Sequence, residues 1–150
     1  MSKQFVVIDL SKQKYCMPIE LVSAVIDEFS VTRVPNSLRY VQGVSNIRGE
    51  ILPVVDLKSI FGIEEQGGGH SKLMSVSISG KNVGLMVDSA SNVISVEENF
   101  VRELPSILQS KEKQYFQTVA EIDGELAIVI NPSGLFTEEE KAEMFRLKEK

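Results

Sequence analysis

Few residues of this chain could carry chemistry on their own. Cys16 is the only cysteine and His70 the only histidine among 150 residues, so the chain cannot form an intrachain disulfide. Catalysis by a Cys–His or Ser–His pair would have to use His70, as would a histidine-containing metal site. Because His70 follows three glycines, and catalytic groups need rigid support, an enzyme built around it is a minor alternative. We expect no catalytic residue, metal ligand or cofactor, and we expect Cys16 and Met17 to lie in a strand of the core.

The stretch 64–71, Glu-Glu-Gln-Gly-Gly-Gly-His-Ser, has the glycine content of a phosphate-binding loop. Such loops follow a strand, precede a helix and usually carry a Lys-Ser or Lys-Thr pair, whereas strand-like sequence follows here. An exposed connector is therefore the expected structure. Because ordering three glycines costs entropy with little gain, we predict that residues 67–69 are mobile and that shortening them leaves the melting temperature nearly unchanged.

The composition argues against nucleic-acid and membrane roles. Sixteen basic and 21 acidic residues give a net charge of −5, whereas affinity for nucleic acid comes largely from neutralising phosphates. No apolar run approaches the roughly 20 residues that span a bilayer, and the apolar run 5–8 is too short for the core of a signal peptide. With 43% hydrophobic and 25% charged residues the chain can bury a core, so we expect a soluble, reduced, cytoplasmic domain.

Most of the apolar patterns are typical of strands. The predicted strands are 5–8, 14–17, 41–48, 51–56, 73–78, 83–87, 93–96, 116–122 and 125–130, with turns at 11–13, 49–50, 79–82 and 123–124. Residues 19–29 predict a short helix that runs into a strand, and residues 104–112 predict a short helix that begins near Pro105. Thr137 and Glu140 have the spacing of a capping box, which predicts a C-terminal helix over 137–150.

The chain contains an internal duplication. Residues 41–61 align with 116–136 at a constant offset of 75. Seven aligned pairs are identical, where chance gives roughly one or two: Gln42 with Gln117, Val44 with Val119, Ile47 with Ile122, Gly49 with Gly124, Glu50 with Glu125, Val54 with Val129, and Phe61 with Phe136. Residues 15–26 align more weakly with 83–94 at an offset of 68, which pairs Glu20 with Asp88.

The duplication predicts how the fold is organised. A unit of about 60 residues is only marginally stable alone, so the units 4–61 and 73–136 should pack together and share a core. Closing each small sheet would hide its edges, so two small β-barrels are expected rather than two open sheets. We treat residues 1–150 as a single domain, with 137–150 as a helical tail.

The two copies differ at four positions of the first motif. Asn46, Arg48, Pro53 and Asp56 align with Glu121, Asp123, Ile128 and Asn131, respectively. Apolar positions that both copies share serve a core, so the unshared positions indicate an interaction that is specific to the first copy. The alternative is that Arg48 is an ordinary cation beside a turn.

The first copy carries one long motif. It reads Val41-x-Gly43-Val44-x-Asn46-Ile47-Arg48-Gly49-x-Ile51-x-Pro53-Val54-Val55-Asp56-Leu57. This motif resembles the signature of CheW-like chemotaxis coupling proteins. Segments 31–35, 83–96 and 122–130 are similar to other parts of the family pattern, in the same order, so that the resemblance runs from about residue 4 to residue 136.

The resemblance implies a fold and a function. Such proteins fold as two five-stranded β-barrels around a shared core, so this chain would be mainly β with short helices and a C-terminal helix. They are not enzymes: they bind the regulatory domain of the histidine kinase CheA and the cytoplasmic tips of chemoreceptors in membrane arrays, without touching nucleic acid or entering the membrane. The implied partner-binding residues, of which the arginine is tied to coupling, are Arg48, Asn46, Gly49, Val41, Gly43, Pro53, Asp56 and Val22.

One position departs from the family pattern. Family members often have a glutamate that can pair with the motif arginine, whereas Ala24 stands at the aligned position here. Glu20, Asp27 or Glu28 could take its place.

Other functions stay open at this stage. The chain could be a purine-type small-ligand-binding β-barrel, although it shows no phosphate cradle and no aromatic cluster for stacking a base. It could also be a CheW-like adaptor of a non-flagellar chemosensory pathway. Residues 137–150 are too few for a receiver domain, which favours a stand-alone coupling protein over a CheV-type adaptor.

Overall fold

The computed structural model describes two β-sheets and a few short helices. It describes residues 2–11, 13–36, 38–63, 72–103 and 116–147. The strands are β1 (Ser2–Leu10), β2 (Gln13–Pro18), β3 (Val22–Ile26), β4 (Val41–Ile47), β5 (Glu50–Asp56), β6 (Lys72–Ile78), β7 (Lys81–Val87), β8 (Ser89–Glu97), β9 (Val101–Glu103), β10 (Phe116–Ile122) and β11 (Glu125–Ile130). The helices are α1 (Leu57–Phe61) and α2 (Glu138–Leu147), with 3₁₀ turns η1 (Ile19–Leu21), η2 (Glu98–Phe100) and η4 (Pro132–Leu135). The predictions for residues 64–71 and 104–112 lie outside the described residues.

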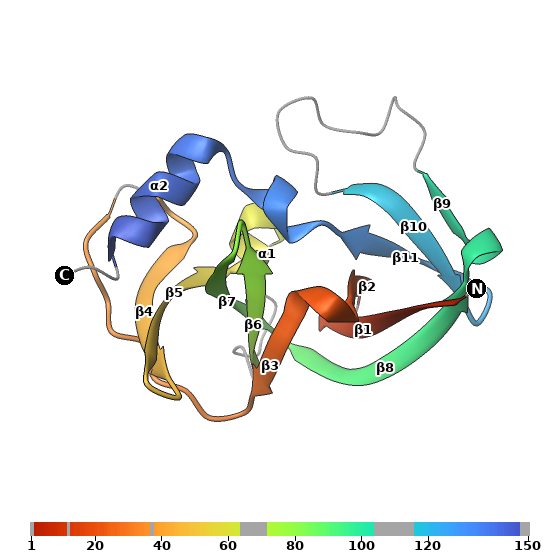
Figure 1. Cartoon of the computed structure of the whole chain (residues 1–150), viewed down its shortest axis with the longest axis horizontal. Coiled ribbons are helices and arrows are strands. Elements are labelled where there is room, and N and C mark those ends of the chain that lie inside the picture. Colours follow the sequence, from red (N-terminus) through yellow and green to blue (C-terminus); the bar gives the residue numbers. More distant parts are fainter. Residues whose placement is uncertain (1, 12, 37, 64–71, 104–115, 148–150) are drawn as a thin grey trace.

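The strands form two sheets that lie side by side (Figure 1). Sheet A has the order β8-β1-β2-β11-β10-β9, and sheet B has the order β3-β6-β7-β5-β4. Neighbouring strands are antiparallel except for β2 with β11 and β5 with β7, which are parallel. The predicted mainly β fold with two β-subdomains is confirmed. Sheet A has one more strand than predicted, the three-residue β9, and the strand pairings leave β8 and β9, and β3 and β4, at the sheet edges.

The two repeat units exchange strands. Strands β1 and β2 of the first unit pair in sheet A with β8 and β11 of the second unit. In return, β6 and β7 of the second unit pair in sheet B with β3 and β5 of the first unit. Each strand of sheet A has a counterpart in the other repeat unit. When each strand is replaced by its counterpart, the order β8-β1-β2-β11-β10 of sheet A becomes the order β3-β6-β7-β5-β4 of sheet B. Each unit contributes to both subdomains, and the N-terminal strand belongs with the second unit.

The pairing register of the β4–β5 hairpin repeats in the β10–β11 hairpin. Val41 lies opposite Val55, and Phe116 opposite Ile130 at the offset of 75. Both hairpins have their irregularity at the next step, between residues 41 and 43 and between 116 and 118. Because equivalent residues have equivalent partners, the registers support the duplication. The limits of the repeat units, 4–61 and 73–136, stay a prediction.

The β4–β5 turn lies one residue earlier than predicted. Arg48 and Gly49 form it, with φ of 53° and 87°, while Glu50 already belongs to β5. Asp123 and Gly124 repeat this geometry with φ of 51° and 80°. Positive φ at both central residues is the type I′ pattern, whose twist matches that of the flanking strands. The predicted strand 41–48 is therefore wrong by one residue at its end, because Arg48 adopts the left-handed conformation.

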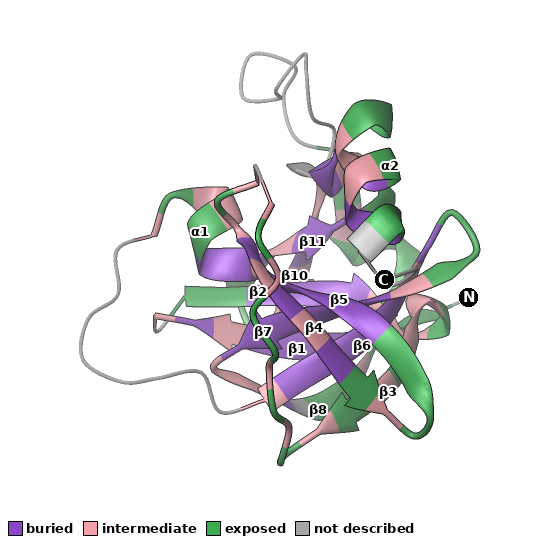
Figure 2. Ribbon diagram, turned by 90° about the vertical axis from the view of Figure 1, so that its left-hand side faces the viewer, coloured by how far each residue is buried: buried purple, intermediate pink, exposed green. Residues whose placement is uncertain are grey.

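Three clusters of buried side chains make up the core. The largest lies between the sheets and joins residues such as Ile8, Met74 and Ile130. A second cluster around Phe5 and Cys16 belongs to sheet A, and a third around Val54, Leu73 and Met86 belongs to sheet B. Figure 2 shows buried residues gathered on the central strands and exposed residues at the hairpin ends and on the outer side of α2. The shared core that the duplication predicts is therefore present, and Cys16 is a core residue as predicted.

The short helices have local causes in the sequence. Residues 19–29 form η1 and then β3, as predicted, because the β-branched residues after Leu21 favour a strand. The helix α1 was not predicted: the Asp56 carboxylate caps its N-terminus by accepting the Lys58 N–H, and Gly62 ends it with φ of 70°. The capping box of α2 is confirmed, because Thr137 N–H donates to Glu140 Oε1 at 2.8 Å and Glu140 N–H donates to Thr137 Oγ1 at 3.2 Å.

Candidate partner-binding surface

The β4–β5 turn presents Arg48 to solvent. The Asn46 side chain organises this turn, because its Oδ1 accepts the Gly49 N–H at 3.0 Å. Asn46, Arg48 and Gly49 are all exposed, and Ile51, 42% exposed, lies on the same hairpin. The result is a rigid hairpin tip that combines a cation with an apolar side chain, a combination suited to a protein contact.

A hydrogen-bonded chain of side chains ties this tip to the rest of sheet B. Asn82 Nδ2 of β7 donates to Glu50 Oε1 at 2.9 Å. Ser23 Oγ of β3 donates to Asn82 Oδ1 at 3.2 Å. Three strands therefore hold the base of the turn in place, and the Arg48 side chain extends from a fixed position.

None of the acids considered for Arg48 pairs with it in the described part of the chain. Asp27 forms an ion pair with Lys72 instead. Glu20 lines a pocket beside β11, and Glu28 is exposed. Together with Ala24, this arrangement leaves the Arg48 guanidinium available to a partner, since no carboxylate of the described residues neutralises it.

The other predicted site residues shape the hairpin and its surroundings. Gly43 has φ of 149°, and a Cβ atom there would lie 2.0 Å from the Thr32 carbonyl oxygen, so only glycine fits. Val41 is 6% exposed and Pro53 is buried, while Val22 is half-buried against the shared core. Asp56 caps α1 as described above. The structure thus places Asn46, Arg48 and Gly49 together at the exposed tip, and the remaining five candidates support the fold around it.

The equivalent tip in sheet A is acidic. Asp123 replaces Arg48, and a groove of about 360 Å³ beside it is lined by Glu97, Glu121, Asp123 and the apolar Ile94, Ile122 and Phe100. Leu126, the counterpart of Ile51, is 63% exposed. The two hairpin tips therefore have the same turn geometry, but Arg48 makes one tip basic where Asp123 makes the other acidic.

One ion pair of a buried lysine was not predicted from the sequence. Lys58 Nζ lies 2.6 Å from Asp88 Oδ1, and the Lys58 side chain is only 5% exposed. Asp88 lies between β7 and β8, and its Oδ2 also accepts the Ser11 N–H at 2.7 Å, so the pair connects α1 and the end of β7 to the β1–β2 turn of sheet A. The only indication in the sequence was the alignment of Asp88 with Glu20, which marks an acidic position in both copies. An isolated lysine in an apolar strand-to-helix junction gave no indication that it is buried.

Neither a metal site nor a membrane-crossing helix emerges from the described residues. Within them, no group of three or more His, Cys, Asp or Glu side chains could hold a metal ion. No helix in the described ranges is long and apolar enough to cross a bilayer.

Burial in sheet A raises the pKa of the Cys16 thiol to about 12, because a thiolate there would lose its hydration.

Known proteins are similar to this chain over nearly its whole length. The model of the CheW-like domain family matches residues 4–140. A probable chemotaxis protein CheW of Rhizobium etli is 27% identical over 139 residues, which cover 92% of this chain and 90% of that protein. A chemotaxis protein CheW of Thermotoga maritima is 31% identical over 99 residues, 65% of this chain and 66% of that protein. The crystal structure of the scaffolding protein TtCheW from Thermoanaerobacter tengcongensis has a TM-score of 0.82 and 33% identity, and the match covers 91% of this chain and 93% of that chain.

Proposed function

The chain belongs to the CheW-like domain family and is an adaptor of chemotaxis signalling, and we propose that it couples chemoreceptors to a CheA-type histidine kinase. Its partners are the regulatory domain of the kinase and the cytoplasmic tips of the receptors, and it works in the cytoplasm, recruited to receptor arrays. The observation that carries this proposal is the family match over residues 4–140, which includes strands of both sheets and not the first motif alone.

In this proposal the chain assembles its partners and catalyses nothing. The state of its one thiol supports this role. A nucleophilic cysteine needs an accessible thiolate, whereas Cys16 is fully buried and its pKa is raised to about 12. The adaptor function requires binding surfaces only, and the exposed apolar and charged hairpin tips supply them.

We assign the coupling contact to the tip formed by Asn46, Arg48 and Gly49. The Asn46 side chain fixes the turn, and the guanidinium has no carboxylate partner within the described residues. An arginine held on a rigid turn loses little conformational entropy when it meets a partner carboxylate, which favours a specific contact. The acidic counterpart at Asp123 cannot make the same contact.

Binding to the two partners tests the proposal. The purified chain should bind both the regulatory domain of a CheA-type kinase and a receptor fragment that contains the signalling tip. Adding the chain to kinase and receptor should raise autophosphorylation of the kinase, while the chain itself acquires no phosphate. Binding to neither partner would contradict the proposal. Calorimetric titration with purine nucleotides distinguishes the small-ligand alternative, and we expect no binding heat.

A further inference from the structure

The carboxylate nearest to Arg48 in the sequence is that of Glu50. Only Gly49 separates the two residues, so their Cα atoms lie at most about 7.6 Å apart, a distance that an arginine and a glutamate side chain can span together. Both side chains are exposed. No ion pair joins them among the residues that the structure describes, because the Glu50 carboxylate is bound to a different group, the Asn82 amide.

The Asn82 amide holds the Glu50 carboxylate against sheet B. Its Nδ2 donates to Glu50 Oε1 at 2.9 Å, and its Oδ1 accepts the Ser23 hydroxyl at 3.2 Å. The amide is therefore engaged at both of its ends, which fixes its orientation. Asn82 is half-buried in β7, an interior strand of the sheet, where it lies opposite Ser77 of β6. The donor to Glu50 thus has a rigid support.

One hydrogen bond is enough to keep the Glu50 carboxylate away from Arg48. Exposed ion pairs are weak, because water screens the charges and two long side chains must be ordered. A hydrogen bond to a charged carboxylate is stronger than one between neutral groups, and the Asn82 donor is already ordered. The Glu50 side chain therefore stays on β7, and the Arg48 guanidinium stays available to another carboxylate.

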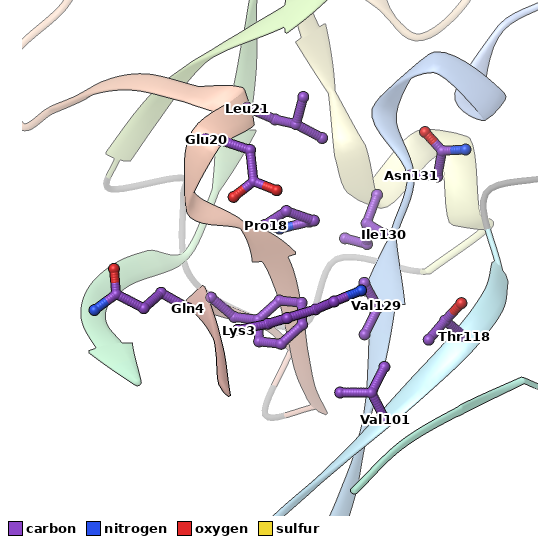
Figure 3. A pocket seen from close by; sticks show the side chains of 11 residues that line it. Lys3, Gln4, Pro18, Glu20, Leu21, Val101, Thr118, Val129, Ile130 and Asn131 are labelled. Carbon is purple, nitrogen blue, oxygen red and sulfur yellow. The ribbon is translucent and has the colours of Figure 1, made fainter. Parts of the chain in front are cut away.

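Two of the other acids considered for Arg48 are also held elsewhere. Asp27 forms an ion pair with Lys72. Figure 3 shows the Glu20 side chain at the pocket beside β11. Glu50 is therefore the acid that the fold must restrain locally if Arg48 is to meet a partner.

The equivalent tip of sheet A has the acid but not the amide. Glu125 is the counterpart of Glu50, and Lys14 is the counterpart of Asn82 at the offset of 68. Lys14 pairs with Asp9, and in the described ranges no hydrogen bond or ion pair links it to Glu125. That tip has no arginine to keep free. The hydrogen bond between amide and carboxylate thus accompanies the arginine.

We propose that Asn82 is a positioning residue for the Arg48 contact: by holding the Glu50 carboxylate on β7, it prevents an internal ion pair that would compete with the partner. This role rests on the proposed function, since it affects coupling only if Arg48 meets a partner carboxylate. Without the amide, Glu50 is released to Arg48, and the partner has to displace it. The strength of exposed ion pairs sets the expected loss at about three- to fivefold.

A double-mutant cycle at Asn82 and Glu50 tests the proposal. Asn82→Ala should raise the concentration of the chain that gives half-maximal receptor-dependent kinase activation by about three- to fivefold. The same change in a Glu50→Gln background should have no effect, because a glutamine amide brings no negative charge to Arg48. A merely structural role of Asn82 would weaken coupling in both backgrounds.

Two further variants complete this experiment. Asn82→Asp keeps the shape of the side chain and repels the Glu50 carboxylate, so it should weaken coupling at least as much as Asn82→Ala. Asn92→Ala removes an exposed asparagine from β8 of the other sheet and should couple like the wild type. Circular dichroism checks that each variant is folded.

Nuclear magnetic resonance detects the internal ion pair without the kinase. The Arg48 Nε–H resonance should shift in Asn82→Ala, because Glu50 then reaches the guanidinium. It should keep its wild-type position when Asn82→Ala is combined with Glu50→Gln.

The outcomes separate this proposal from the proposed function. If Arg48→Glu loses coupling while Asn82→Ala has the same effect in both backgrounds, or leaves the Arg48 resonance in place, the positioning role is wrong and the adaptor function stands. If Arg48→Glu couples like the wild type, the contact assigned to Arg48 is wrong, and the role of Asn82 in coupling fails with it.

Discussion

Gly43 is required by the close approach of two backbone segments. The chain around Thr32 runs beside β4, with Thr32 N–H donating to the Val44 carbonyl at 2.8 Å and Val44 N–H donating to the Thr32 carbonyl at 2.9 Å. A methyl group on Gly43 would collide with that carbonyl, and φ of 149° is strained for any other residue.

Gly43→Ala should therefore lower the free energy of unfolding by about 3 kcal/mol, measured by urea denaturation. Gly62→Ala is the matched control, because Gly62 also has a positive φ but no atom lies within 4 Å of its added Cβ. That control should lose only about 1 kcal/mol. Equal losses for the two variants would show that close approach at Gly43 adds nothing to the strain of its φ.

The buried thiol of Cys16 makes stability depend on pH in the alkaline range. Its ordinary pKa is 9.0, and burial raises the pKa to about 12. Because the folded-state pKa is the higher one, the stabilisation from the neutral thiol is complete below pH 9 and is lost as the pH rises toward 12. The free energy of unfolding should fall in this range by up to about 1.4 kcal/mol per pH unit more in the wild type than in Cys16→Ala.

Urea denaturation of both proteins at successive alkaline pH values measures this difference. Tyr15 and Tyr40, whose pKa values burial also raises, are present in both proteins, so the difference isolates the thiol. Parallel stability curves for the two proteins would mean that the thiol titrates normally and is not buried.

The exposed residues of the candidate site could be predicted from the sequence, while the ion pair between Lys58 and Asp88, which lies outside that site, could not. The replacement of Arg48 by Asp123 between the copies marks a position that the shared core does not determine, and the structure places Arg48 at an exposed turn. Lys58 lies in α1, and its burial depends on Asp88, which is distant in sequence. No local pattern reveals such a pair, because the two residues meet only after the sheets have packed.

At the scale of elements, the Glu140 carboxylate both caps α2 and joins this helix to Tyr40, the residue before β4. Glu140 Oε1 accepts the Thr137 N–H in the capping box, and Glu140 Oε2 accepts the Tyr40 hydroxyl. Burial raises the pKa of the Tyr40 hydroxyl, and its hydrogen bond to Glu140 raises this pKa further. The Met144 and Phe145 side chains are buried, and the Lys81 ammonium lies 4.7 Å from the centre of the Phe145 ring.

Thr137→Ala should lower the free energy of unfolding by about 1 kcal/mol, because Glu140 N–H loses its side-chain acceptor. Chemical denaturation followed by circular dichroism measures the change. Glu139→Ala is the control, since it removes an acid from the same turn without removing a cap, and should change stability by less than about 0.5 kcal/mol. A loss as small for Thr137→Ala as for Glu139→Ala would show that the cap does not stabilise α2.

The residues of the turns made the hairpins predictable from the sequence. The shortest elements, η2 and β9, have no such sequence signature and were not predicted. The Asp123-Gly124 turn has a strong sequence signature, and both strands beside it have the predicted limits, 116–122 and 125–130. The 3₁₀ turn η2 and the strand β9 together span only Glu98–Glu103, which is too short for hydrophobic periodicity to develop. The three residues of β9 are defined by pairing with β10, a tertiary contact.

At the scale of the whole molecule, strand exchange makes the two repeat units depend on each other. The first unit alone would keep the β1–β2 and β4–β5 hairpins but lose the partners of β1, β2, β3 and β5 in the second unit. Isolated two-stranded hairpins are marginally stable in water. The offset alignment could not reveal this exchange, because it identifies equivalent strands without stating which strands are neighbours.

Fragments 1–63 and 72–150 should therefore not fold separately. Each alone should give a circular dichroism spectrum of a largely unfolded chain, and an equimolar mixture should recover the β-sheet spectrum and a cooperative thermal transition. The intact chain provides the reference spectrum. Cooperative unfolding of either fragment on its own would contradict the interdependence of the two units.

We propose that the coupling contact lies at one end of a pseudo-symmetric molecule. Both ends have the same turn geometry, so the difference between Arg48 and Asp123 can be tested without disturbing the backbone. Arg48→Glu and Asp123→Arg are the matched variants, because each places the charge of one tip on the other. Both residues are exposed, and such changes usually alter the free energy of unfolding by no more than about 0.5 kcal/mol.

Receptor-dependent activation of a CheA-type kinase, reconstituted with the wild-type chain or either variant, is the most direct measurement. We predict that Arg48→Glu remains folded and lowers kinase activation by about tenfold or more, while Asp123→Arg couples like the wild type. Normal coupling by a folded Arg48→Glu variant would contradict the proposed role of Arg48. Unfolding of that variant would contradict it too, because Arg48 would then be a structural residue.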